Sequence, residues 1–162
     1  MGDKFDQYFT VCTDALHAEE AAMDRLTDRA DKYLATIGVL LGFHIVEPKP
    51  LTFSGDAAHI AFSGAAAAGL GLLIVALGLM LWSMRLRTYP TFSKTVDLQE
   101  LAKAPSAESA KYSAAEFYLK LRDEILAINE KRASILKVAG MVLVVGFLLA
   151  AVGQLGLGLK LN

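Results

Sequence analysis

Four residues whose side chains could bind a metal ion or carry a proton lie between residues 44 and 59. They form two pairs, His44 with Glu47 and Asp56 with His59. The two members of each pair are three residues apart, so they can share one face of a helix. Imidazole and carboxylate groups bind metal ions and relay protons, which makes an ion or proton site at a membrane surface one hypothesis. Since this spacing is common, the alternative is that they are ordinary polar residues at the interface.

The remaining reactive residues form no catalytic pattern. Cys12 is the single cysteine, which excludes an internal disulfide, and it lies five residues from His17, a poor spacing for a shared helix face. The sequence contains no G-x-S-x-G, H-E-x-x-H or P-loop motif. We therefore expect a protein that is not an enzyme and has no cofactor, with Cys12 as a packed small apolar residue.

The composition is that of a membrane protein. Of the 162 residues, 54% are hydrophobic, and the mean hydropathy is +0.42. Soluble domains have a smaller apolar share and no long uncharged segments. The net charge of −1 gives no basic footprint, so nucleic acid is not an expected partner. The sequence predicts an all-α integral membrane protein with three transmembrane helices, in which cytoplasmic amphipathic helices are continuous with spans 1 and 3.

The predicted segments differ in how well their lengths fit a bilayer. The second and third apolar segments reach about 37 and about 33 Å as helices, whereas the first reaches only about 21 Å, against a hydrocarbon core of about 30 Å. The first could span with Lys32 and Tyr33 at the interface or in a thinned bilayer, or could be a buried soluble helix. The predicted order is a cytoplasmic helix (1–32), span 1 (33–46), an external loop (47–59), span 2 (60–84), a cytoplasmic helical region (85–134), span 3 (135–159) and an external tail (160–162).

Two apolar stripes predict helix pairing outside the membrane. One runs from Phe5 to Tyr33 with alternating spacings of four and three, broken only at Glu19, and continues toward His44. The other consists of Tyr118, Leu121, Ile125 and Ile128. We expect the two stripes to pack as a two-helix hairpin, which oligomerisation could multiply. The second helix is expected to begin at the capping box Ser113-x-x-Glu116, after a linker at 104–111.

Small residues and one amide mark the interior of the apolar segments. Gly64, Gly69 and Gly71 lie in the second segment, where small residues let helix backbones approach closely. Helix packing is one interpretation of this face, and pore lining is the other. Gln154 is the one strongly polar side chain of the third segment, and it could donate hydrogen bonds between helices or form a pore constriction.

The distribution of Lys and Arg predicts the topology. Four precede the first apolar segment, one lies in 47–59, nine lie in 85–132 and one is in the tail. Because positively charged loops stay in the cytoplasm, the N-terminus is expected inside and the C-terminus outside the bacterial inner membrane, with several passes between them.

Two short sequences at the starts of the first and third apolar segments resemble those of a known group of proteins. They are RADKYL (29–34) and INEKRASIL (128–136). The chain resembles the small multi-span membrane effectors of bacterial anti-phage defence, of the SLATT and Pycsar types. Those proteins place short cytoplasmic helices with an Asp-x-Lys or Asn-x-x-Lys/Arg step before a span. The resemblance implies an oligomeric effector that disturbs the bilayer when triggered, and the matching residues, a candidate face for a signal or partner, are Asp31, Asn129, Lys131 and Arg132.

Three functions are compatible with the sequence. The first is a non-enzymatic, membrane-disrupting or channel-like effector controlled through its cytoplasmic helices. The second is a structural or accessory subunit of a larger membrane complex, and the third is an ion or proton transporter that uses the four residues of 44–59. The expected partners are membrane lipid, further copies of this chain and a protein at the cytoplasmic helices.

Overall fold

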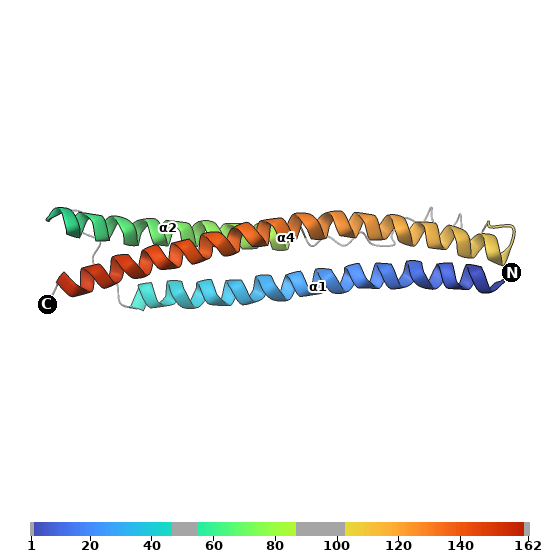
Figure 1. Ribbon diagram of the computed structural model, residues 1–162, viewed down its shortest axis with the longest axis horizontal. Coiled ribbons are helices and arrows are strands. Elements are labelled where there is room, and N and C mark those ends of the chain that lie inside the picture. Colours follow the sequence, from blue (N-terminus) through green and yellow to red (C-terminus); the bar gives the residue numbers. More distant parts are fainter. Residues whose placement is uncertain (1, 47–54, 87–102, 161–162) are drawn as a thin grey trace. The chain divides into compact units, whose positions relative to one another are not determined.

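The computed structural model describes residues 2–46, 55–86 and 103–160, and for residues 2, 3, 5, 43–46, 159 and 160 it describes the backbone alone. Within these residues all regular secondary structure is helical and forms three helices (Figure 1). They are α1 (Gly2–Val46), α2 (Ala57–Arg85) and α4 (Ala107–Lys160). The prediction of an all-α protein is confirmed.

Helix α1 is a single helix of 45 residues, as its uninterrupted stripe predicts. No proline or glycine occurs between Asp3 and Ile37, so nothing breaks the backbone hydrogen-bond pattern. The buried side chains of α1 recur every seven residues from Leu16 through Met23 and Ala30 to Ile37. This repeat is that of a coiled coil, with one face of α1 packed along its length.

Helix α2 begins with a side-chain cap. The Asp56 carboxylate accepts a hydrogen bond from the backbone N–H of His59 (Oδ1 to N, 2.8 Å), and Gly55 before it adopts a φ of +140°. Such a cap satisfies one of the N–H groups that a helix leaves open at its start. The helix therefore starts three residues before the predicted span at 60–84.

Helix α4 starts earlier than the sequence analysis predicts. Its cap is Ser106, whose Oγ accepts a hydrogen bond from the N–H of Ser109 at 3.1 Å. Residues 107–111 are helical, so the prediction of a linker at 104–111 with a start at Ser113 is wrong for most of that segment. Ser106-x-x-Ser109 lacks the acidic residue of a full capping box, whereas Ser113 has one. Helix α4 therefore begins after Ser106, because the Ser106 hydroxyl caps the helix by accepting the hydrogen bond from the backbone.

The chain divides into two compact units. Unit 1 comprises residues 1–27 and 86–132, and unit 2 comprises residues 28–85 and 133–162. Helices α1 and α4 contribute residues to both units, and α2 belongs to unit 2.

In unit 1, α1 and α4 pair through the two predicted stripes (Figure 1). Leu16 and Met23 of α1 form one buried cluster with Leu121 and Ile125 of α4, and the partly buried Phe117, Tyr118 and Ile128 pack against it. The pairing of the stripes is confirmed, but the expected hairpin is wrong. Asp6 contacts Lys111 and Glu19 contacts Asn129, so residue numbers rise together and the two helices are parallel.

In unit 2, α4 packs against α2 at very short distance. A Cβ atom on Gly69 would overlap the backbone of Ala150, and one on Gly153 would overlap the backbone of Ala66. The contacts advance in opposite directions, so these helices are antiparallel. On its other side α4 meets α1, where the ring of Tyr33 lies against Gly140. Gly69 and Gly153 thus allow the two helix backbones to approach closely.

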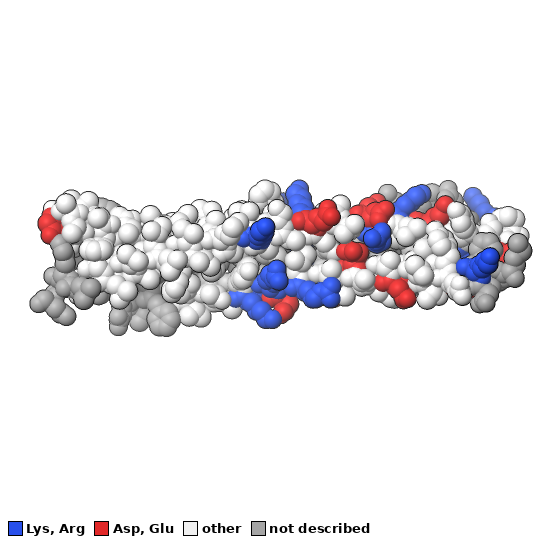
Figure 2. Space-filling view, in the orientation of Figure 1, with Lys and Arg blue, Asp and Glu red and all other residues white. Residues whose placement is uncertain are grey.

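The outer surface of unit 2 is apolar. Of the 17 exposed large hydrophobic side chains among the described residues, all but Tyr8, Val11 and Tyr112 belong to unit 2. The visible face of its apolar segments is white in Figure 2, without Lys, Arg, Asp or Glu. The exposed large hydrophobic side chains of unit 2 are Val39, Ile60, Ile74, Val75, Leu81, Trp82, Val138, Met141, Val144, Val145, Phe147, Leu148, Val152 and Leu155.

Two of the described helices are long and apolar enough to cross a membrane, α2 and the stretch Ala107–Gly158 of α4. They contain the predicted spans 60–84 and 135–159. Helix α1, which contains the segment 33–46, is not among these two, so a third crossing stays a prediction.

Candidate functional site

The structure places the four candidate signal residues in two environments. Asn129 and Arg132 are buried in unit 1, with exposed fractions of 5% and 0%, whereas Lys131 and Asp31 are exposed. Successive residues of a helix point about 100° apart, so Lys131 faces away from the seam that holds Asn129 and Arg132. The four residues therefore do not form one accessible face.

Asn129 and Glu19 form a polar layer across the α1–α4 seam. The Asn129 amide donates from Nδ2 to the backbone oxygen of Glu19 at 2.9 Å and to its carboxylate Oε2 at 3.2 Å. Glu19 is the residue that breaks the apolar stripe of α1. The break is thus matched by a polar partner on α4, while the buried Oδ1 of Asn129 makes no hydrogen bond within the described residues.

Arg132 lies in a second polar layer of the same seam. Its Nη2 donates to Thr27 Oγ1 at 3.1 Å, and Thr27 Oγ1 in turn donates to the backbone oxygen of Met23 at 3.0 Å. An arginine that is fully buried in a two-helix seam must exchange water for such partners, because an isolated charge there is unfavourable. We name the four residues Glu19, Thr27, Asn129 and Arg132 the polar seam.

Neither α1 member of the polar seam, Glu19 or Thr27, is among the residues that the sequence predicts for a functional site. Continuing the spacing of three and four from Tyr118 along α4 reaches Ile125, Asn129, Arg132 and Leu136, so the pattern contained the signal for the two α4 members. Glu19 was identifiable as the break in the α1 stripe. No sequence pattern indicates Thr27, because its role depends on the hydrogen bond that it accepts from Arg132, which is distant in sequence.

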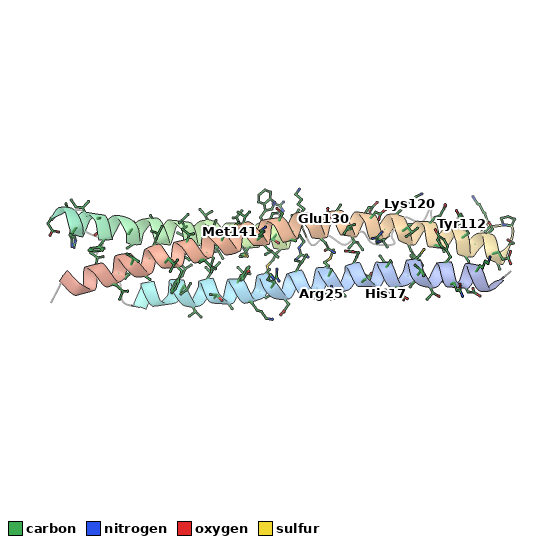
Figure 3. All side chains as sticks on the ribbon, in the orientation of Figure 1. His17, Arg25, Tyr112, Lys120, Glu130 and Met141 are labelled. Atoms are coloured by element: carbon green, nitrogen blue, oxygen red, sulfur yellow. The ribbon has the colours of Figure 1, made fainter. Side chains whose placement is uncertain are left out.

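An aromatic group packs at the start of unit 1. The rings of Tyr8 and Tyr112 stack with centroids 6.1 Å apart, and Tyr112 is labelled in Figure 3. Burial raises the pKa of Tyr8, and the hydrogen bond with Glu116 raises the pKa of Tyr112. Both effects disfavour the phenolate, so the stacked pair stays neutral at physiological pH.

The pore and packing candidates of unit 2 also separate. Gly69 lies in the α2–α4 contact, whereas a Cβ on Gly64 or Gly71 would meet nothing within 4 Å. Gln154 is half-buried in α4. The structure therefore uses Gly69 for internal packing and leaves the two other glycines on open helix faces.

The proposed ion or proton site is only partly described. Asp56 is engaged in capping α2, and His59 is the residue whose backbone it caps. The His44 side chain and Glu47 lie outside the described residues. Among the described side chains, no group of three or more His, Cys, Asp or Glu residues could hold a metal ion.

Cys12 is 1% exposed and lies in the α1 stripe, which confirms its interpretation as a packed residue, while His17 is exposed (Figure 3).

Comparison of the chain with models of protein families, with curated proteins and with solved structures finds no match.

Proposed function

We propose that this chain is a non-enzymatic protein of the bacterial inner membrane that assembles from identical copies into a channel-like or membrane-disrupting effector. Its cytoplasmic unit 1 controls the assembly, in the manner of the anti-phage effectors that it resembles. The observation that carries the proposal is the pattern of unit 2, in which 14 large apolar side chains are exposed while most of the buried face of α2 consists of small residues.

This pattern of unit 2 favours a lipid environment. Five of the seven buried residues of α2 are small, namely Ser63, Ala66, Gly69, Ala76 and Ser83, and the other two are Leu73 and Met80. The exposed large side chains of the same helix are Ile60, Ile74, Val75, Leu81 and Trp82. In water, burial of large apolar groups drives packing, and a contiguous exposed apolar surface of this kind is rare on soluble monomers. In lipid, helices associate through small residues and leave large ones to the acyl chains.

The open glycine faces support self-assembly. Beyond Gly64 and Gly71, a Cβ on Gly78 or Gly38 would also meet nothing within 4 Å. Such positions let another helix approach as closely as α4 approaches Gly69. The same faces could instead receive a different protein, which keeps an accessory subunit of a larger complex as the second candidate function.

Control through unit 1 is supported by the polar seam. Buried polar residues in a coiled coil specify one register at some loss of stability. A ligand or partner that offers these polar groups other hydrogen bonds would therefore favour a different pairing of the two helices. Because α1 and α4 both continue into unit 2, a change in their register is the signal that we propose for the apolar segments.

The deciding experiment is the mass of the detergent-solubilised protein, expressed alone, with every copurifying chain identified. We expect one species at a multiple of the 17.4 kDa chain mass. A monomer contradicts the self-assembled effector, and a fixed complex with other proteins favours the accessory subunit.

A positive result leads to ion flux through liposomes. We expect flux from the wild type and a change in its rate or selectivity in Gln154→Leu, which removes the amide from α4. Val152→Leu, at an exposed position two residues away, is the matched control and should leave flux unchanged. Absence of flux from an assembled wild type contradicts a channel.

A further inference from the structure

We propose that unit 2 binds the headgroups of anionic phospholipids through a basic belt formed by Arg29, Lys32, Arg85 and Lys137. The inference rests on the proposed membrane insertion of unit 2 and adds a lipid class to it. All four side chains are exposed, and they come from all three helices.

The helix contacts of unit 2 bring the belt to one level. Gly153 of α4 faces Ala66 of α2, and the two helices are antiparallel. Each step forward along α2 therefore corresponds to one step back along α4. Counted in this way, Trp82 is level with Lys137, and Arg85 is level with residue 134. On the other side, the contact of Tyr33 with Gly140 in a parallel pair places Arg29 and Lys32 near residues 136 and 139. The four bases thus lie within about 9 Å along the helix axes, at 1.5 Å per residue.

The charge at this level is positive. Two acids accompany the four bases, Asp28, which forms an ion pair with Lys32 at 2.6 Å, and the exposed Asp31. Within the described part of the chain, Arg29, Arg85 and Lys137 make no ion pair. Four bases against two acids leave a net charge of +2 at this level, which is available to an external anion.

The position of the belt selects a lipid phosphate as that anion. Beyond Lys137, α4 carries no charge until Lys160, and α2 carries none between Asp56 and Arg85. A ring of bases at the end of such segments lies at headgroup depth, where Lys and Arg attract anionic lipids and where Trp and Tyr are favoured. Trp82, which is 54% exposed, marks this level.

Trp82 also provides the measurement, because it is the only tryptophan of the chain. The full-length protein is reconstituted in mixtures of phosphatidylglycerol and phosphatidylcholine in which one or the other is brominated, and quenching of Trp82 fluorescence reports which lipid lies beside it. We expect phosphatidylglycerol to be preferred about fivefold, the effect of one basic residue near an anionic surface.

The triple variant Arg29→Gln/Arg85→Gln/Lys137→Gln should lose this preference. The matched control is Lys4→Gln/Lys103→Gln/Lys120→Gln, which removes three exposed charges of unit 1 (Lys120 is labelled in Figure 3) and should keep it. Added glycerol phosphate should leave the preference unchanged, and its loss on that addition would assign the belt to a free anion.

The outcomes separate the two proposals. Equal quenching by both brominated lipids, or a preference that survives in the triple variant, overturns lipid selection by the belt while membrane insertion stands. If neither brominated lipid quenches Trp82, unit 2 is not in the bilayer, and both proposals fail.

Discussion

Arg132 and Lys131 are neighbours in α4 with opposite environments. Arg132 is completely buried and hydrogen-bonded to Thr27, whereas Lys131 is exposed. The aliphatic part of a buried arginine packs like an apolar residue, so its loss removes contacts as well as a charge. The pair therefore offers a direct comparison of a seam position with a surface position.

We predict that Arg132→Ala lowers the free energy of unfolding by about 2 kcal/mol, because a hydrogen bond from a charged donor and the packing of its stem are both lost. Lys131→Ala should change it by no more than about 0.5 kcal/mol. The measurement is thermal unfolding in detergent, followed by the helical circular dichroism signal. Equal effects of the two substitutions would show that the seam around Arg132 is not formed.

Gly69 and Gly71 are a second pair of near neighbours with opposite surroundings. A methyl group on Gly69 would collide with the backbone of Ala150, and one on Gly71 would meet open space. We predict that Gly69→Ala destabilises the α2–α4 contact by about 1–3 kcal/mol, the usual effect of overpacking.

Gly71→Ala should be neutral or should stabilise by up to about 1 kcal/mol through helix propensity. Both variants are compared by unfolding in a denaturing detergent series. Destabilisation by Gly71→Ala equal to that of Gly69→Ala would indicate that the face of Gly71 is already occupied, as in an assembly of copies.

At the scale of elements, the α1–α4 pair combines an apolar stripe with the polar seam. The Asn129–Glu19 layer leaves the buried Asn129 Oδ1 without a hydrogen bond within the described residues. An incompletely satisfied polar layer is less stable than a packed apolar one, but it restricts the register in which two helices can pair. The layer thus favours specificity over stability.

We predict that the double variant Glu19→Leu/Asn129→Leu raises the free energy of unfolding by about 1 kcal/mol or more, since apolar replacement of a buried polar set is often stabilising. Asn129→Leu alone should gain less, because the Glu19 carboxylate then faces a leucine. The measurement is the melting temperature of the wild type, of Asn129→Leu and of the double variant, which we expect to rise in that order. A double variant that melts below the wild type would mean that the layer stabilises the pair.

At the scale of the whole molecule, the number of crossings determines the topology of the proposed membrane protein. Helix α2 and the apolar part of α4 are long enough to span, while α1 carries only the 14 apolar residues of 33–46. Crossing by α1 decides whether the start of the chain and the start of α2 lie on the same side.

We predict three crossings, tested with single cysteines in a Cys12→Ala background. A membrane-impermeant maleimide added to intact cells should label Ala58→Cys but neither Lys4→Cys nor Lys103→Cys, all three of which are exposed positions. Permeabilised cells provide the control, in which all three should react. If Lys4→Cys and Ala58→Cys react alike in intact cells, the segment 33–46 does not cross.

The sequence by itself determined the helices and much of their pairing. Periodic apolar residues without proline specify α1, and the uncharged segments specify α2 and the end of α4, since both signals are local and repeat many times. The stripe of α1 and that of α4 predicted their contact, because an apolar helix face needs a partner. Cys12 as a packed residue followed from the same pattern.

Only the tertiary structure decided the parallel direction of α1 and α4, the start of α4 at Ala107 and the inward direction of Asn129 and Arg132. Each depends on atoms distant in sequence or on one side-chain rotamer. Thr27 stabilises Arg132 only because the parallel pairing brings them together, and Gly69 differs from Gly71 only because α4 covers one face of α2. A periodic pattern shows that a face is buried, but the identity and direction of the covering element come from packing in three dimensions.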